Sequence, residues 1–136
     1  MNNNDATIVK ICLRIWGKDI SPAEVTDLLK IEPSKCHSKG ESISENGTIR
    51  NYKTGYWEIS SPPEFEPQDI DSHLEYFLNI CRNSKSSLSD ISGIDGADIH
   101  FIVGVEENAD SFEFGLCASV LAEIASVGLG VTFVVI

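Results

Sequence analysis

The sequence lacks the short motifs that mark the common classes of enzymes and metal sites. It contains no G-x-x-x-x-G-K-[ST] phosphate loop, no G-x-G-x-x-G dinucleotide turn, no G-x-S-x-G serine elbow and no H-E-x-x-H zinc motif. None of its 3 histidines has a carboxylate or a thiol at the spacing of metal ligands. We therefore expect no enzymatic activity, no cofactor and no bound metal.

Long apolar runs, signal-like segments and paired cysteines are also missing. No apolar stretch reaches the roughly 20 residues of a membrane span, and residues 1–5 lack the basic and apolar regions of a signal peptide. The 4 cysteines are scattered and include no C-x-x-C pair, which is typical of reduced thiols. These features predict a cytoplasmic protein without a disulfide framework.

Positive charge is scarce in the second half of the chain. Residues 1–60 hold 8 basic and 8 acidic side chains, whereas residues 61–136 hold 2 basic and 13 acidic ones and carry the whole net charge of −11. Such a surface repels nucleic acid and anionic membranes and attracts basic proteins. We therefore expect no nucleic-acid or membrane partner and favour a basic protein partner. The alternative, that the acidic residues only keep the protein soluble, stays open.

The chain length of 136 residues suits a single domain, which we expect to span residues 1–136 with a disordered tail at 1–6. A strand is predicted over residues 7–17, because apolar residues alternate there and define a buried face: Val9, Ile11, Leu13 and Ile15. The segment Ser21-Pro22-Ala23-Glu24 then predicts a capping box at the start of a short helix that ends before Pro33.

The remaining elements are predicted from turn residues and apolar periodicity. They are a hairpin of 41–45 with 48–52, a strand at 55–60, a helix at 69–85, a hairpin of 98–105 with 111–116, a helix at 117–127 and a strand at 131–136. The last strand is apolar on both faces, which predicts a central position in the sheet. We expect an α+β domain of ferredoxin-like kind, in which an antiparallel sheet carries helices on one face. The strand-to-helix order of residues 11–29 and 113–127 hints at a degenerate internal repeat.

Few residues suggest chemistry. Cys36 and His37 adjoin as a nucleophile and a base, but catalytic pairs are matched in space rather than in sequence, so a polar loop end is the favoured interpretation. His73 is expected on the surface, and His100 on the strand face opposite the buried residues. The acidic turn at 106–110 lacks the spaced oxygen ligands of a calcium loop, which favours a solvated turn over a cation site.

Several short patterns together resemble one family. They are I-x-L-x-I-x-G at 11–17, S-P-x-E-x-x-x-L-L-x-I-x-P at 21–33, S-K-G-E at 38–41, G-Y-W-x-I-S at 55–60, the pair His73-Leu74, and L-A-E-I-A-x-x-G at 121–128. The combination resembles the small bacterial family called domain of unknown function 4279, over nearly the whole chain. The ending Phe133-Val134-Val135-Ile136 departs from the acidic and aromatic ending of that family. The resemblance implies a compact α+β domain without an established activity, and it supplies no catalytic residues.

Two functions of different classes compete. The favoured one is an immunity protein that binds and neutralises a basic toxin domain through acidic loop residues, namely Glu64, Glu66, Asp95, Glu106, Glu107 and Asp110. The alternative is a small-ligand-binding or homodimeric structural domain with Trp16, Tyr56 and Trp57 as its aromatic anchors. A cysteine-dependent enzyme that uses Cys36 and His37 is the least favoured hypothesis.

Overall fold

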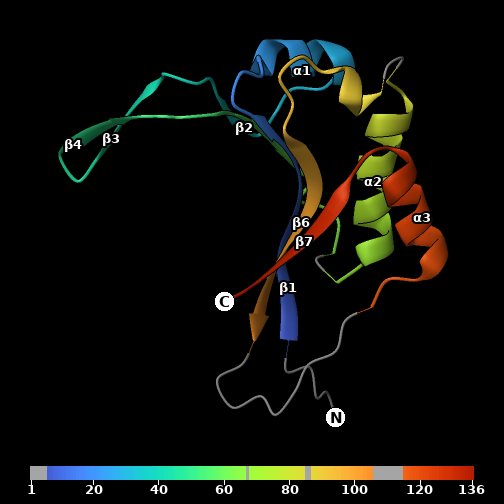
Figure 1. Ribbon diagram of the computed structural model, residues 1–136. Helices are drawn as coiled ribbons and strands as arrows, with labels where there is room; N and C mark the ends of the chain where they lie inside the picture. The colour runs from blue at the N-terminus through green and yellow to red at the C-terminus, as the bar shows by residue number, and fades with distance from the viewer. Residues whose placement is uncertain (1–5, 67, 85–86, 106–114) are drawn as a thin grey trace.

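The computed structural model describes residues 6–66, 68–84, 87–105 and 115–136. A five-stranded sheet forms its centre, in the spatial order β2 (Lys35–His37), β5 (Gly55–Ser60), β1 (Ala6–Gly17), β6 (Gly96–Val105) and β7 (Gly130–Val135). The other elements are α1 (Pro22–Leu29), the hairpin of β3 (Ser42–Glu45) with β4 (Thr48–Asn51), α2 (Ile70–Arg82), a 3₁₀ turn η1 (Leu88–Asp90) and α3 (Ala118–Ser126). The helices α2 and α3 cover one face of the sheet, and α1 lies at its end (Figure 1). The predicted α+β class is confirmed, and the predicted placement of helices on one face is found for α2 and α3 but not for α1.

The direction of the strands differs from the prediction in one place. β5, β1, β6 and β2 pair antiparallel, but β7 runs parallel to β6 and is connected to it through α3. A parallel pair needs such a crossover, whereas an antiparallel pair can be joined by a short turn. The sheet is therefore mixed, the prediction of a purely antiparallel sheet is wrong, and a ferredoxin-like topology is not confirmed.

The long strand β1 alternates as predicted over most of its length. Ile11, Leu13 and Ile15 are buried, but the register with β6 shifts between Ile8 and Lys10. A β-bulge of this kind inserts one residue and moves the following side chains to the other face. Ile8 therefore enters the core and Val9 is 55% exposed, so the predicted burial of Val9 is wrong. The first described residue, Ala6, already lies in β1, although residues 1–6 were expected to form a tail.

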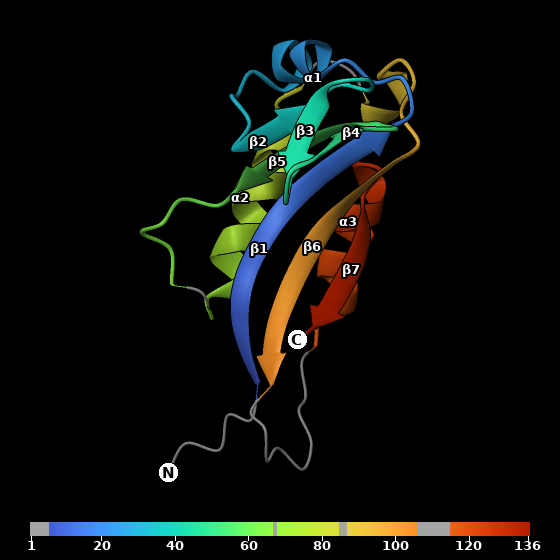
Figure 2. The same ribbon diagram turned by 90° about the vertical axis from the view of Figure 1, so that its left-hand side faces the viewer.

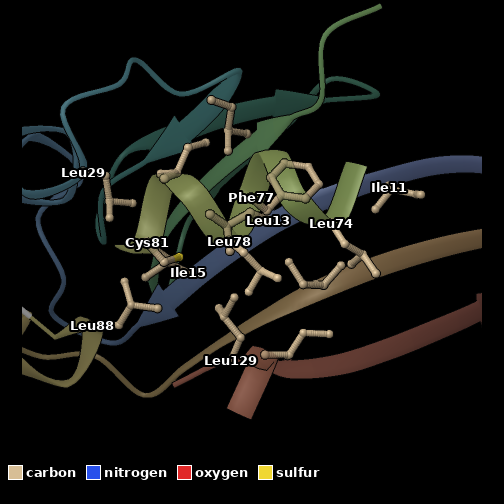
Figure 3. Close-up of a cluster of buried hydrophobic side chains, with 14 of the residues drawn as sticks. Ile11, Leu13, Ile15, Leu29, Leu74, Phe77, Leu78, Cys81, Leu88 and Leu129 are labelled. Atoms are coloured by element: carbon tan, nitrogen blue, oxygen red, sulfur yellow. The ribbon is translucent and has the colours of Figure 1, made fainter. Parts of the chain in front are cut away.

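The core forms between the helix-covered face of the sheet and α2. Leu74, Phe77 and Leu78 lie on the inner face of α2 and are at most 2% exposed. Figure 3 shows these side chains gathered with Leu13 and Ile15 of β1. Full burial of one such side chain stabilises the fold by about 1.5–3 kcal/mol, so this layer supplies much of the apolar driving force.

The start of α1 follows the predicted pattern in part. Ser21 accepts a hydrogen bond from the backbone N–H of Glu24 at 3.4 Å, as a helix cap requires. The Glu24 carboxylate, however, accepts from the backbone N–H of Ser92 at 3.3 Å. The acidic residue of the expected capping box therefore connects α1 to the loop before β6.

The last strand, β7, lies at the edge of the sheet, so its predicted central position is wrong. Its apolar character on both faces leaves large side chains exposed, including Val135 at 53%. The predicted strand 111–116 falls mostly outside the described residues, and Gly115 and Leu116 belong to no strand. The suggested repeat of 11–29 in 113–127 also includes residues outside the description. None of the described helices is long and apolar enough to cross a membrane.

Candidate functional site on the open face of the sheet

The face of the sheet opposite α2 and α3 carries the polar and aromatic residues that could serve a function. In Figure 2 this open face is turned toward the viewer, with the β3–β4 hairpin in front of it. Because successive residues of a strand point to opposite faces, the partners of the core residues gather here. From β2 to β7 they include Lys35, His37, Tyr56, Glu58, Lys10, Cys12, Arg14, Trp16, Asp98, His100 and Thr132.

Four rings form an aromatic row across one end of the open face: Tyr52, His37, Tyr56 and Trp16. The Tyr52 and His37 rings stack with centroids 3.4 Å apart, and the His37 and Tyr56 rings lie 5.6 Å apart. Tyr56 pairs in turn with Trp16 of β1. A Cβ atom added at Gly96 of β6 would lie 2.4 Å from the Trp16 ring, so a glycine there makes room for the indole. The aromatic row thus joins the base of the hairpin to the middle of the sheet.

A charged row of alternating sign lies beside the aromatic row: Lys35, Glu58, Arg14 and Asp98 occupy four adjacent strands. Arg14 binds Asp98 through two bonds, Nε to Oδ1 at 2.9 Å and Nη2 to Oδ2 at 2.6 Å. The Thr132 hydroxyl also donates to Asp98, at 2.6 Å. Because the Asp98 carboxylate accepts two hydrogen bonds from Arg14 and a third from Thr132, little of its charge is left without a partner.

The carboxylate of Glu58 is held in a similar way. It accepts from Lys10 Nζ at 3.0 Å and from the Tyr56 hydroxyl at 2.5 Å. Glu58 and Asp98 are only 6% and 3% exposed, although they lie on the face that no described helix covers. Long neighbouring side chains therefore shield both acids from water while they neutralise them.

These bonds determine the ionisation of the open face. Burial alone would raise the pKa of Glu58, but the hydrogen bonds from Tyr56 and Lys10 outweigh burial and hold its pKa below the ordinary value. The bond to Glu58 raises the pKa of Lys10. Burial and the same carboxylate raise the pKa of Tyr56. At neutral pH Glu58 and Lys10 are therefore charged and Tyr56 is protonated, which favours a stable, internally paired surface.

The thiol of Cys12, on this face, is not an activated nucleophile. Cys12 Sγ lies 3.8 Å from His100 Nδ1, but burial raises the pKa of the thiol to about 12. A thiol with so high a pKa is a poor nucleophile at neutral pH. Cys36 and His37 are successive residues of β2 and point to opposite faces, so they do not form a pair. The predicted placement of His100 on the face opposite the core is confirmed.

His73 lies elsewhere, and its predicted surface position is wrong, because it is only 5% exposed. Its Nδ1 forms a hydrogen bond with the Ser61 hydroxyl, and its Nε2 bonds the Glu66 carbonyl oxygen at 2.8 Å. The Phe65 ring packs edge-on against it. His73, Ser61 and Phe65 border a cavity of about 180 Å³. Because both ring nitrogens bind the loop between β5 and α2, we assign this histidine to the anchoring of that loop.

The acidic residues predicted to bind a partner lie in separate places. Glu64 and Glu66 are exposed in the loop before α2, where Gln68 bonds Ile8 near the start of β1. Asp95 lies at the other end of β1, where its N–H bonds the Trp16 carbonyl and its carboxylate accepts from the Lys18 N–H. The β1 residues beside them, Ile8 and Trp16, are separated by about 26 Å of strand, at 3.3 Å per residue. Glu106, Glu107 and Asp110 lie outside the described residues, as does the cation site considered there.

Glu64 and Glu66 do belong to a larger acidic group. We name the exposed residues Glu64, Glu66, Asp69, Asp71 and Glu75 the acidic strip. Arg82, about two turns beyond it on α2, already pairs with Glu75 at 3.1 Å and with Glu123 of α3. The last three members of the strip were not among the predicted contacts, although five acids within 12 residues are visible in the sequence. No group of three metal-ligating side chains occurs in the part of the chain that the structure describes.

The aromatic anchors of the alternative hypothesis separate into two sets. Trp16 and Tyr56 are register partners on the open face. Trp57 is fully buried on the other face, and its indole nitrogen donates to the Thr26 hydroxyl at 3.0 Å. Trp57 therefore fastens α1 to the core and offers no surface to a ligand.

Comparison with known protein families shows where this chain belongs. The family described as Domain of unknown function (DUF4279) matches residues 7–135, which is nearly the whole chain. No curated protein and no solved structure matches.

Proposed function

The chain belongs to the DUF4279 family, and we propose that it is a non-enzymatic interaction protein that binds a basic protein partner. More specifically, we propose that the partner is a toxin domain and that this protein neutralises it as its immunity protein. The acidic strip carries this proposal. Its five carboxylates are exposed, and Arg82, the cation that pairs with Glu75 of the strip, also pairs with Glu123 of α3.

Charge and position suit the acidic strip for recognition of a basic surface. Exposed acids gathered on one side of a protein speed encounter with a basic partner and discourage acidic competitors. The charged row of the open face is less suited to this role, because its carboxylates are buried and bonded to Arg14, Lys10 and Thr132. The strip therefore offers the more available negative charge.

The first test is affinity purification of the tagged protein from its native cell at low and at high salt. A basic partner recovered in stoichiometric amount, and weakened by high salt, supports the proposal. The partner's affinity is then measured for a strip variant, Glu64→Lys with Glu66→Lys and Asp71→Lys. A control variant with the same change of net charge, Asp19→Lys with Asp27→Lys and Glu32→Lys, alters exposed acids near α1.

We expect the strip variant to weaken binding at least about tenfold, or 1.4 kcal/mol, and to reduce the salt dependence. The control variant should change both much less. Equal losses in the two variants would show that only net charge matters, and unchanged binding in the strip variant would reject the acidic strip as the contact surface. Recovery of the protein without a partner at either salt would reject the proposed function.

A second candidate function rests on the aromatic row. Trp, Tyr and Arg are the residue types that contribute most to binding interfaces, and Trp16, Tyr56 and Arg14 lie together on the open face. A small ligand or a second protein could stack there. Since Trp57 is buried, a change of tryptophan fluorescence with metabolite mixtures that disappears in Trp16→Phe would support this function. An unchanged signal with every mixture would argue against it.

A further inference from the structure

A small cavity lies between the start of β1 and the loop that joins β5 to α2, at the left of Figure 2. Its volume is about 180 Å³, and an apolar cavity of about 150 Å³ can hold a benzene molecule. Its apolar wall is made of Ile8, Val9, Ile11, Pro62, Pro63 and Phe65. Because Val9 is 55% exposed and Pro63 is also exposed, we place the mouth of the cavity at these two residues.

The polar side chains that border the cavity are already bound within the protein. The Ser61 hydroxyl and Nδ1 of His73 form a hydrogen bond, and Nε2 of His73 bonds the Glu66 carbonyl oxygen at 2.8 Å. The ammonium of Lys10 is bound by Glu58 at 3.0 Å. A polar occupant gains little from groups that have their partners, whereas an apolar occupant gains by leaving water. The lining of the cavity therefore favours an apolar occupant.

The described residues of the loop are held on two sides, so the cavity is already formed. The side-chain amide of Gln68 accepts from the Ile8 N–H at 3.3 Å and donates to the Ile8 carbonyl at 3.1 Å, which ties the loop to β1. His73 ties the loop to α2, and the Phe65 N–H closes a turn on the Pro62 carbonyl at 3.1 Å. Walls that are fixed beforehand favour binding, because they need not be ordered by the occupant.

The acidic strip begins beside this cavity. Glu64 and Glu66 flank Phe65 in the sequence, and both are exposed. A partner that inserts an apolar side chain next to Phe65 therefore meets carboxylates close to the inserted residue, which favours lysine or arginine as its neighbours. Binding interfaces commonly combine an apolar anchor in a closed pocket with a polar rim around it.

We propose that the cavity receives one apolar side chain of the basic partner, about the size of phenylalanine, while basic residues next to it pair with Glu64 and Glu66. This inference rests on the proposed function, because the acidic strip supplies the charge that selects the partner. It adds the kind of segment that the partner presents, which is an apolar anchor between basic residues. Such an anchor distinguishes one basic partner from another, which net charge alone does not do.

The test uses a short peptide, with phenylalanine between two pairs of lysines, in place of the partner. One control peptide has alanine instead of phenylalanine, and a second has glutamates instead of the lysines. Binding to the isotope-labelled full chain is followed by NMR titration up to about 5 mM peptide, which detects millimolar dissociation constants. In the protein, Val9→Trp fills the mouth of the cavity without a change of charge. Ile49→Trp is the matched control, at a hairpin residue that is 73% exposed.

The phenylalanine peptide should bind at least about tenfold more tightly than the alanine peptide, with the largest shifts at Val9, Phe65 and His73. Val9→Trp should abolish this preference, and Ile49→Trp should keep it. The amide spectrum checks that each variant is folded, and the two lysine peptides on wild type decide the question if Val9→Trp is not.

Two kinds of failure are distinguishable. Equal binding of the two lysine peptides, or a preference that Val9→Trp leaves intact, would overturn the anchor and leave the acidic strip as a contact surface. Equal binding of the lysine and glutamate peptides would reject selection by charge, and with it the contact surface of the proposed function. No binding of any peptide at the highest concentration would also overturn the inference.

Discussion

The two faces of the sheet show two different ways to bury a side chain. On the helix-covered face, Phe77 and Leu78 of α2 pack against Leu13 of β1, and these side chains carry no polar atom. On the open face, Glu58 and Asp98 are as well buried as many core residues, yet each is bonded to a cation and to a hydroxyl. Burial on the first face follows from apolar area, and burial on the second depends on pairing.

This difference determines how each face responds to change. When a buried apolar side chain is shortened, the free energy of unfolding falls with the number of atoms removed and with the size of the cavity that remains. A buried ion pair stabilises a fold little more than an apolar pair of the same shape. Removal of one partner, however, is destabilising, because it leaves a buried charge without an opposite charge beside it. Stability should therefore depend on side-chain size at the helix-covered face. At the open face it should depend on whether each buried charge keeps its partner.

The largest expected effect is on the helix-covered face. Phe77→Ala removes a fully buried ring from the layer between α2 and the sheet. We expect the free energy of unfolding to fall by about 3–5 kcal/mol, measured by urea denaturation at pH 7. Ile49→Ala, at an exposed hairpin position, is the control and should change stability by less than about 0.5 kcal/mol. A loss below about 1 kcal/mol for Phe77→Ala would contradict this account of the core.

A smaller effect is expected in the charged row. Asp98→Ala leaves Arg14, whose side chain is 23% exposed, and Thr132 without their shared acceptor. Because Arg14 can turn partly toward water, we expect a loss of about 1–3 kcal/mol in urea denaturation. The double variant Arg14→Met with Asp98→Leu removes both charges and should recover most of this loss. If the double variant were less stable than Asp98→Ala, the paired row would contribute net stability, contrary to this comparison.

Local patterns predicted the elements of this fold but not their arrangement. The Asn46-Gly47 turn, the alternation of β1 and the apolar face of α2 are encoded within short segments, and all are found in the structure. The place of β7 depends on which distant strand accepts its hydrogen bonds. Its apolar residues suit a central strand and an unprotected edge strand equally well, so the sequence pattern could not separate the two.

The candidate site was visible from the sequence only in pieces. Alternation along β1 places Arg14 and Trp16 on the face opposite the core, and the same argument correctly placed His100. The partners that make this face a network are far away in the chain, however: Arg14 and Asp98 are 84 residues apart. Trp57 was misjudged because its neighbour Tyr56 is half-buried on the open face, and the two aromatic residues were treated as one cluster.

The smallest expected effect is the pH dependence of the open face. Glu58 has a folded pKa below its ordinary value of 4.5, chiefly because its hydrogen bonds outweigh its burial. Its stabilising contribution is therefore complete above about pH 4.5, near the unfolded pKa, and is lost as pH falls through the folded pKa. Glu58→Gln should lower stability by about 1–2 kcal/mol at pH 7, and the difference from wild type should shrink as the pH falls below 4.5. Glu45→Gln, which breaks an exposed ion pair in the hairpin, should change stability by less than about 0.5 kcal/mol. A difference for Glu58→Gln that stays constant down to acidic pH would show that the carboxylate contributes through its shape and packing rather than through its charge.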